Sequence, residues 1–113
     1  MNCIFCAIIE GKIPSSVVYE DEKIMAIRDI NPQAAVHVVV FPKQHAITCA
    51  DDITADNAAV VADIFAKAPL IAAKLGLVNG YRIINNCGAD ACQTIKHLHF
   101  HILGGQPLPE RMG

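Results

Sequence analysis

Tryptophan is absent from this 113-residue chain, aromatic residues make up only 5% of it, and the formal net charge is only −2. So small a charge gives no electrostatic reason to expect DNA, RNA or an anionic membrane surface as a partner. No stretch approaches the roughly 20 apolar residues that a membrane-spanning helix needs. The first residues show neither a basic region nor a cleavage site, so we expect no secretory signal and a cytoplasmic location.

The composition is that of a folded globular domain. Hydrophobic residues make up 53% of the chain and charged residues 18%, which is well away from intrinsic disorder. A chain of this length can bury a core without disulfide bonds, and without repeats or linkers we expect one domain over residues 1–113. Because no export signal is visible, we expect the cysteines to be reduced thiols or metal ligands. There are five of them, namely Cys3, Cys6, Cys49, Cys87 and Cys92.

The pattern of apolar residues predicts an α+β fold with five strands and two helices. Most neighbouring strands are joined by short connections rather than by helices, which favours an antiparallel sheet over a parallel one. The first two strands flank a short charged turn and form a hairpin by their length. Strands are expected at residues 17–19, 24–28, 37–41, 81–85 and 96–103.

The two helices are expected at residues 3–10 and 54–75. Gly11 can end the first helix, since glycine accepts the left-handed conformation that often follows a helix. Thr54 can cap the start of the second helix through its hydroxyl group. Pro69 lies inside the second pattern and should either kink that helix or end it early.

Near the C-terminus, histidines alternate with large apolar residues. Alternation with a period of two is typical of a half-buried strand, whose successive side chains point to opposite faces. We therefore expect Leu98, Phe100 and Ile102 to face a core and the imidazoles to line the other face in a row. The histidines of this row are His97, His99 and His101.

These three histidines cannot all bind one metal ion without a sharp bend. Along a strand the outer two Cα atoms lie roughly 13 Å apart, whereas zinc needs each ligand nitrogen at about 2.0–2.1 Å. The other use of such a row is nucleophilic catalysis, in which a neutral imidazole attacks phosphorus or an acyl carbon. His99 is best placed for that attack, because its two neighbours can contact the groups around the reacting atom.

A loop of small and polar residues at positions 88–94 leads directly into the histidine row. Its backbone N–H groups and the Thr94 hydroxyl can form a concave set of donors for an anion. Asn85 and Asn86 end the preceding strand and add side-chain donors. By itself the loop is also compatible with a plain connection, but beside the histidines it predicts a phosphate-binding site.

The sequence around the histidines resembles the signature of a known family. Residues 93–105 read QTIKHLHFHILGG, similar to the histidine-triad (HIT) nucleotide-binding proteins of the Hint-type branch. The resemblance extends over nearly the whole chain and includes residues 13–14, 18–21, 29–34, 37, 42–45 and 80–82.

The resemblance implies a five-stranded antiparallel sheet with two helices per chain, and a homodimer in which two sheets form one continuous ten-stranded sheet. It implies a purine nucleoside phosphoramidase whose ligands are AMP, GMP or their phosphoramidates. His99 matches the nucleophile that attacks the α-phosphorus and forms a nucleotidyl-histidine, which water then hydrolyses. His101 matches the residue that contacts the phosphate and helps the leaving group take a proton. His97 and Thr94 complete the expected catalytic set.

Further positions match nucleotide contacts of the family. Asp29 matches the carboxylate that accepts the ribose hydroxyls, and a carboxylate suits a vicinal diol. For the apolar members of the set, ordinary core packing is the alternative. The wall of the nucleobase slot is expected at Phe5, Ile8, Ile27, Arg28 and Ile30, and phosphate or leaving-group contacts at Asn86, Cys92, Gln93 and Thr94, with His99 and His101.

Cys3 and Cys6 have the spacing of one half of a tetrahedral zinc site. The remaining cysteines do not form a second such pair, so histidines must supply the other two ligands, and His45 and His97 are the candidates. The resemblance to zinc-bearing members of the family, and to the related galactose-phosphate uridylyltransferases, implies these same four ligands. We therefore expect a structural zinc that fixes the first helix against the sheet. Two small buried thiols are the alternative.

The chain departs from the family in two places. Relatives carry glycines just before the Gln93 position, where this chain has Ala91 and Cys92, and a left-handed backbone there would strain a residue other than glycine. Cys92 also brings a thiol near the phosphate, with sensitivity to oxidation as a consequence. The C-terminal tail, residues 106–113, lacks the aromatic residue that helps several relatives select the leaving group.

Two other functions could use the same pocket. One is a nucleotide-binding regulatory protein with incidental hydrolysis, and the other is a dinucleoside polyphosphate hydrolase of a neighbouring branch. Tight nucleotide binding with negligible turnover would favour the first, and cleavage of P–O–P rather than P–N bonds would favour the second. His37 can support the histidine row by hydrogen bonding or serve as an ordinary core histidine.

Overall fold

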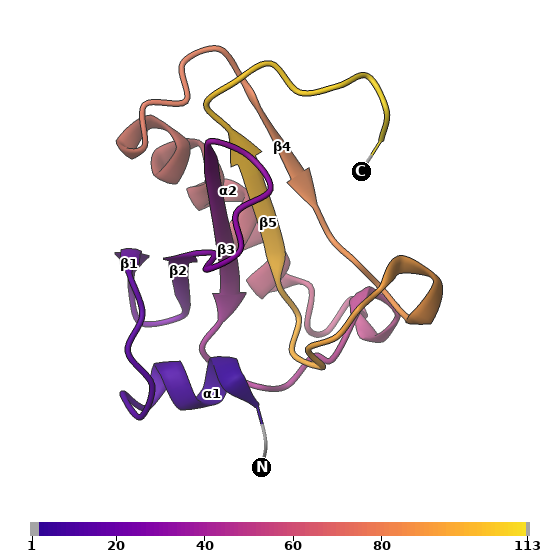
Figure 1. Ribbon diagram of the computed structural model, residues 1–113. Coiled ribbons are helices and arrows are strands. Elements are labelled where there is room, and N and C mark those ends of the chain that lie inside the picture. The colour runs from indigo at the N-terminus through magenta and orange to yellow at the C-terminus, as the bar shows by residue number, and fades with distance from the viewer. Residues whose placement is uncertain (1–2, 113) are drawn as a thin grey trace.

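The computed structural model describes residues 3–112, which form a five-stranded sheet. The strand order is β1-β2-β3-β5-β4, so the last strand of the chain lies inside the sheet, beside the third (Figure 1). All neighbouring strands are antiparallel, as predicted. The strands are β1 (Val17–Glu20), β2 (Ile24–Arg28), β3 (Val36–Pro42), β4 (Tyr81–Ile84) and β5 (Phe100–Gly104).

Two α-helices pack on this sheet, which confirms the predicted number. In Figure 1, α1 (Ile4–Ile9) lies across one end of the sheet and α2 (Ala59–Lys74) lies behind it. Two short 3-10 helices, η1 (Ala50–Asp52) and η2 (Ala89–Ala91), lie in the connections. Among residues 3–112, no helix has the length and apolar character needed to cross a membrane.

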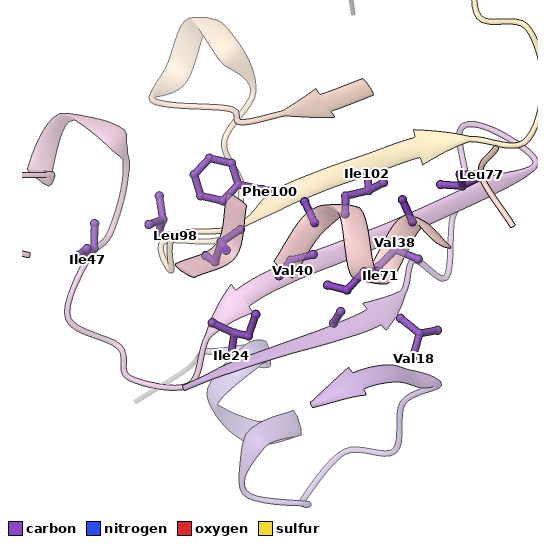
Figure 2. Packing of buried hydrophobic residues seen from close by; sticks show 14 residues of the cluster. Val18, Ile24, Val38, Val40, Ile47, Ile71, Leu77, Leu98, Phe100 and Ile102 are labelled. Atoms are coloured by element: carbon purple, nitrogen blue, oxygen red, sulfur yellow. The ribbon is translucent and has the colours of Figure 1, made fainter. Parts of the chain in front are cut away.

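The two faces of the sheet carry separate apolar clusters. On the α2 side, Leu98, Phe100 and Ile102 are buried together with residues of β3 and α2 (Figure 2). On the other side, Phe5 of α1 stacks on Phe41 of β3 with 4.3 Å between ring centroids. The alternation in the histidine row is therefore confirmed. At His97 and His99 this face is buried, because Phe5 of α1 packs against both rings.

The predicted last strand begins too early. Residues 96–99 are not part of β5, whose pairing with β3 starts where Phe100 lies opposite Val40. Before Phe100 the backbone is hydrogen-bonded to a different segment, because the Leu98 N–H donates to the Ile47 carbonyl at 2.9 Å. The fourth strand similarly stops at Ile84, because the neighbouring Asn85 uses its side chain to reach the main chain.

The second helix also begins later than predicted. Thr54 starts a separate turn, in which its hydroxyl accepts from the Asp56 N–H, and α2 begins at Ala59 without a side-chain cap. The helix then continues through Pro69 to Lys74, so an early end at this proline is wrong. Buried residues of α2 lie on both sides of Pro69, and their packing against the sheet outweighs the one hydrogen bond that the proline removes.

Candidate functional site

A cavity of about 710 Å³ opens between α1, the end of β2 and the histidine row. Its wall is apolar on the side of α1 and β2, and polar where the loop before β5 and the histidines meet it. This combination of an apolar wall with a few convergent polar groups is typical of a small-molecule site. The predicted residues that line it are Phe5, Ile8, Ile27, Arg28, Asp29, Ile30, Asn86, Cys92, Thr94, His99 and His101.

Three residues predicted for the catalytic or phosphate site do not line the cavity. The Asn85 side chain donates to the His99 carbonyl rather than facing the cavity. The Gln93 side chain is turned into the loop, and the His97 ring is fully buried beneath the cavity wall. Sequence reasoning also missed part of the wall, including Ser15 and Ser16. These serines directly follow Ile13 and Pro14, two of the residues that resemble the family. That resemblance is the only feature of the sequence that could have placed Ser15 and Ser16 at the site.

His99 is held in one tautomer by the main chain. Its Nδ1 lies 2.7 Å from the carbonyl oxygen of His97, which can only accept, so Nδ1 carries the proton. In the neutral form of the ring, Nε2 is therefore the nitrogen without a proton. The carbonyl of His99 itself accepts from the Asn85 side chain at 2.9 Å, so the backbone on which the ring is mounted is also fixed. The result is a positioned imidazole with a free lone pair in a ring that lines the cavity.

A chain of hydrogen bonds fixes the tautomer of His101 in the opposite sense. The Gln33 N–H donates to Nδ1 of His37 at 3.0 Å, so the proton of His37 is on Nε2. That N–H donates to Nδ1 of His101 at 2.9 Å, which leaves the Nε2–H of His101 as a donor. Asp29 lies beside this chain, with its Oδ2 atom 3.4 Å from Nε2 of His37. His37 thus supports the histidine row by hydrogen bonding, as one of the two interpretations predicted.

The same buried chain should make stability depend on pH. Burial, with His99 and His37 nearby, lowers the pKa of His101 from 6.5 to about 4. As the pH falls below 6.5, His101 becomes protonated in the unfolded chain but stays neutral in the folded protein until about pH 4. The free energy of unfolding therefore decreases between pH 6.5 and about pH 4. The contribution of His101 is at most about 3 kcal/mol. Denaturant unfolding at several pH values should give a shallower profile for His101→Gln, whereas parallel profiles would contradict the assignment.

The loop before the histidines has a left-handed residue that is not glycine. Cys92 has φ 61° and ψ 38°, and it follows η2, which begins after Gly88. The side chain of Gln93 braces this loop from inside. Its Oε1 accepts from the Gly88 N–H at 3.0 Å, and its Nε2 donates to the carbonyls of Thr48 and Ile95 at 2.8 and 3.1 Å. With these bonds the Gln93 amide holds the shape of the loop.

Cys92→Gly should stabilise the protein. A left-handed conformation costs an L-residue about 1–2 kcal/mol, and part of this gain is offset because glycine has more freedom in the unfolded chain. We expect a net increase of about 1 kcal/mol in the free energy of unfolding. Cys92→Ala is the matched control, since it removes the thiol but keeps the strained backbone. Equal stabilities of the two variants in urea would refute a backbone origin.

The four predicted metal ligands meet at the other end of the histidine row. Nδ1 of His97 lies 3.3 Å from Sγ of Cys3 and 3.7 Å from Sγ of Cys6, which is 3.2 Å from Nδ1 of His45. All four ligand atoms lie within 4.8 Å of one another. Zinc bonds of about 2.3 Å to sulfur and 2.0–2.1 Å to nitrogen in a tetrahedron require nearly these separations.

The protonation of the two histidines also fits a metal. Nε2 of His97 lies 2.7 Å from the Pro42 carbonyl, and Nε2 of His45 lies 2.7 Å from the Lys96 carbonyl. Each Nε2 therefore carries a proton, and in the neutral form of each ring Nδ1 directs a lone pair toward the thiols. Burial also lowers the pKa of His97, which keeps the ring neutral as a ligand must be. The chemistry of this donor set fits Zn²⁺.

Comparison with known proteins agrees with this geometry. The HIT domain matches residues 10–108. A 14 kDa zinc-binding protein of Zea mays is 41% identical over 106 residues, which cover 93% of this chain and 83% of the relative. The Arabidopsis thaliana protein named adenylylsulfatase HINT1 is 38% identical over 106 residues, which cover 93% of this chain and 72% of that protein.

Solved structures extend the likeness to the whole fold. A histidine triad protein from Clostridium difficile has a TM-score of 0.93 and 44% identity, covering 99% of this chain and 97% of its own. A HIT family hydrolase from Clostridium thermocellum has a TM-score of 0.94 and 46% identity, covering 98% and 96%. With sequence and fold alike over nearly its full length, the chain belongs to the HIT domain family.

Proposed function

We propose that this protein is a purine nucleoside phosphoramidate hydrolase that acts through a covalent nucleotidyl-histidine. The observation that carries the proposal is the tautomer of His99, whose Nδ1–H is held by the His97 carbonyl at 2.7 Å and whose Nε2 is therefore free. A fixed, neutral imidazole is a competent nucleophile toward phosphorus. The relatives described as HIT family hydrolases support the reaction class.

In the proposed reaction, Nε2 of His99 attacks the α-phosphorus and the bond from phosphorus to the leaving amine breaks. The negative charge of the bound phosphate favours the protonated form of His101, whose Nδ1 then no longer accepts from His37. This form gives its Nε2 proton to the departing nitrogen. A water molecule then attacks the same phosphorus, loses a proton to His101, and breaks the bond to His99. The products are a free amine and a nucleoside monophosphate, and both histidines return to their starting states.

The other residues of the cavity receive binding roles in this proposal. Asp29 accepts the ribose hydroxyls, and the phosphate is held by the Asn86 side chain and the Thr94 hydroxyl. The Cys92 N–H, expected as a further donor, closes the η2 turn on the Ala89 carbonyl at 3.0 Å instead. Gln93 acts by holding the loop that carries these donors. The purine lies against the wall formed by Phe5, Ile8, Ile27, Arg28 and Ile30.

Two further features belong to the proposal. Cys3, Cys6, His45 and His97 are proposed to hold a zinc ion, which when bound would fix α1 against the sheet and keep the His97 carbonyl in place for His99. We also propose a homodimer that joins two sheets through edge strands, because β1 and β4 are the edge strands of the sheet that residues 3–112 form and exposed edges promote association. Sedimentation equilibrium measures the dimer directly.

The covalent intermediate tests the function. The protein is mixed briefly with an adenosine or guanosine phosphoramidate, quenched in base to preserve the phosphorus–nitrogen bond, and examined by mass spectrometry. We expect a mass increase of one nucleotidyl group, located by peptide mapping at His99. Product formation with the group on another residue, or with no adduct at any time, would refute the mechanism.

The leaving group requires a separate comparison. A relative is named adenylylsulfatase, so an adenylyl group bound to sulfate is a second candidate substrate for the same nucleophile. Rates on matched P–N, P–O–P and P–O–S substrates with one nucleoside would rank the three. We expect the phosphoramidate to be cleaved with the highest kcat/KM, and a preference for either other bond would assign this chain to that reaction instead.

A further inference from the structure

Another group of potential metal ligands lies outside the cavity and apart from the site of Cys3, Cys6, His45 and His97. It brings together Cys49, which caps η1, Asp51 within η1, and Cys87 in the loop that follows β4. One ligand atom from each lies within 4.8 Å of the other two. The segments are almost 40 residues apart in the chain, so the fold rather than the local sequence creates the cluster. None of the three lines the nucleotide cavity.

The surroundings of this cluster are acidic. A second carboxylate, that of Asp52, lies 3.8 Å from Sγ of Cys49. Among residues 3–112, neither Asp51 nor Asp52 forms an ion pair with a lysine or arginine. The Asp51 N–H acts to lower the pKa of Cys49, but burial, the Cys87 thiol and Asp52 together raise it. A cation held between the thiols would offset the negative charge of these carboxylates.

The solvent exposure of the cluster and the softness of its sulfur ligands decide which cation it can bind. Cys49 and Cys87 are half-buried, while Asp51 is exposed, so an ion can enter from solvent and keep an open coordination position. Two sulfur ligands select soft or borderline metals, and a carboxylate oxygen is a common third ligand of zinc. In a tetrahedral zinc site such ligand atoms lie about 3.5–3.8 Å apart, which small side-chain rotations can reach.

We infer that Cys49, Asp51 and Cys87 form a second metal site, which binds a thiophilic divalent cation such as Zn²⁺ or Cd²⁺. Binding forms two metal–sulfur bonds and one metal–oxygen bond and releases the two thiol protons to solvent. With three protein ligands the site should bind more weakly than the four-ligand site of Cys3, Cys6, His45 and His97.

The position of the cluster gives the ion a mechanical role. Gln93 already joins the same two segments, since it bonds to Thr48 and Gly88, the residues next to Cys49 and Cys87. An ion between the two thiols would add a second and stronger link between the segment of Cys49 and the start of the loop at residues 88–94. Occupancy of the second site should therefore reduce the mobility of this loop. The metal site itself does not depend on the proposed enzymatic function.

The test counts bound ions under reducing conditions. The purified protein, kept reduced by a phosphine, is stripped with a chelator and titrated with ¹¹³Cd²⁺, followed by sulfur-to-metal absorption and by ¹¹³Cd NMR. We expect two ions per chain and two resonances, since a two-sulfur, two-nitrogen site differs from a two-sulfur, one-oxygen site. Cys49→Ser/Cys87→Ser should lose one resonance, and Cys3→Ser/Cys6→Ser should lose the other.

Two further variants make the assignment specific. Asp51→Asn, which keeps both thiols, should weaken the second site by about tenfold or more. Cys92→Ala, which removes the exposed thiol of the loop that follows Cys87, should keep both ions. One ion in the wild type with no loss in Cys49→Ser/Cys87→Ser would overturn the inference. It would be overturned equally if Cys49 and Cys87 formed a disulfide on air oxidation and bound no second ion when reduced.

Discussion

Replacement of His99 by alanine is expected to lower kcat/KM for a purine nucleoside phosphoramidate by about 10⁴-fold or more. The reason is that Nε2 of His99 is the unprotonated nitrogen that the hydrogen-bond network makes available at the cavity. Nε2 of His101 cannot replace it, because that atom carries a proton as long as His37 donates to Nδ1 of the same ring. Steady-state rates with one substrate would measure the loss.

Binding and turnover should separate in this variant. Asp29 and the apolar wall remain, so the Kd for the nucleoside monophosphate should change by only a few-fold. His101→Gln is the matched control, since it removes the proton donor and keeps the nucleophile. It should lower kcat by about 10²–10⁴-fold and still form the nucleotidyl adduct, whereas His99→Ala should form none. If His99→Ala turned over substrate near the wild-type rate, His99 would be excluded as the nucleophile.

The double substitution Cys3→Ser/Cys6→Ser is expected to remove one bound zinc ion and about 4 kcal/mol of stability. An ion held about a thousandfold above its Kd stabilises the folded state by this amount. The loss should concentrate at the N-terminal end of the fold, since α1 has only six residues and a helix this short is not stable alone. Metal analysis and urea unfolding measure both effects.

A chelator provides the internal check for this prediction. Stripping the ion from the wild type should lower its stability toward that of the double variant, and the variant should respond much less. Cys92→Ala, which removes an exposed thiol in another loop, should keep its zinc. Full zinc content in Cys3→Ser/Cys6→Ser would show that these cysteines are not ligands.

The faces of the histidine row could be predicted because alternation is a property of the local chain. Leu98 and Phe100 lie in the α2-side core, and His97 and His99 lie on the opposite side, although the strand itself starts only at Phe100. The start of the strand depends on hydrogen bonds to a segment more than 50 residues away, which no local pattern contains. Pairing of this kind is decided by the tertiary fold.

The site was predictable where a residue type carries its own chemistry. The cysteine spacing near the N-terminus and the histidine row led to four ligand atoms that do meet. The role of Gln93 was not visible, because an amide can bind phosphate or brace a loop, and its three internal bonds appear only in the fold. The grouping of Cys49 with Cys87 was hidden for a similar reason, since almost 40 residues separate these two cysteines in the chain.

The imidazole of His37, which lies between Asp29 and His101, couples recognition of the sugar to the chemistry at phosphorus. The carboxylate that would receive the ribose lies 3.4 Å from the same nitrogen that orients the proton donor. A 2′-deoxy or 3′-deoxy analogue would therefore leave Asp29 free to compete for that nitrogen. Such analogues should react slowly even at saturating concentration. The loss of a ribose hydroxyl should therefore lower kcat as well as raise KM.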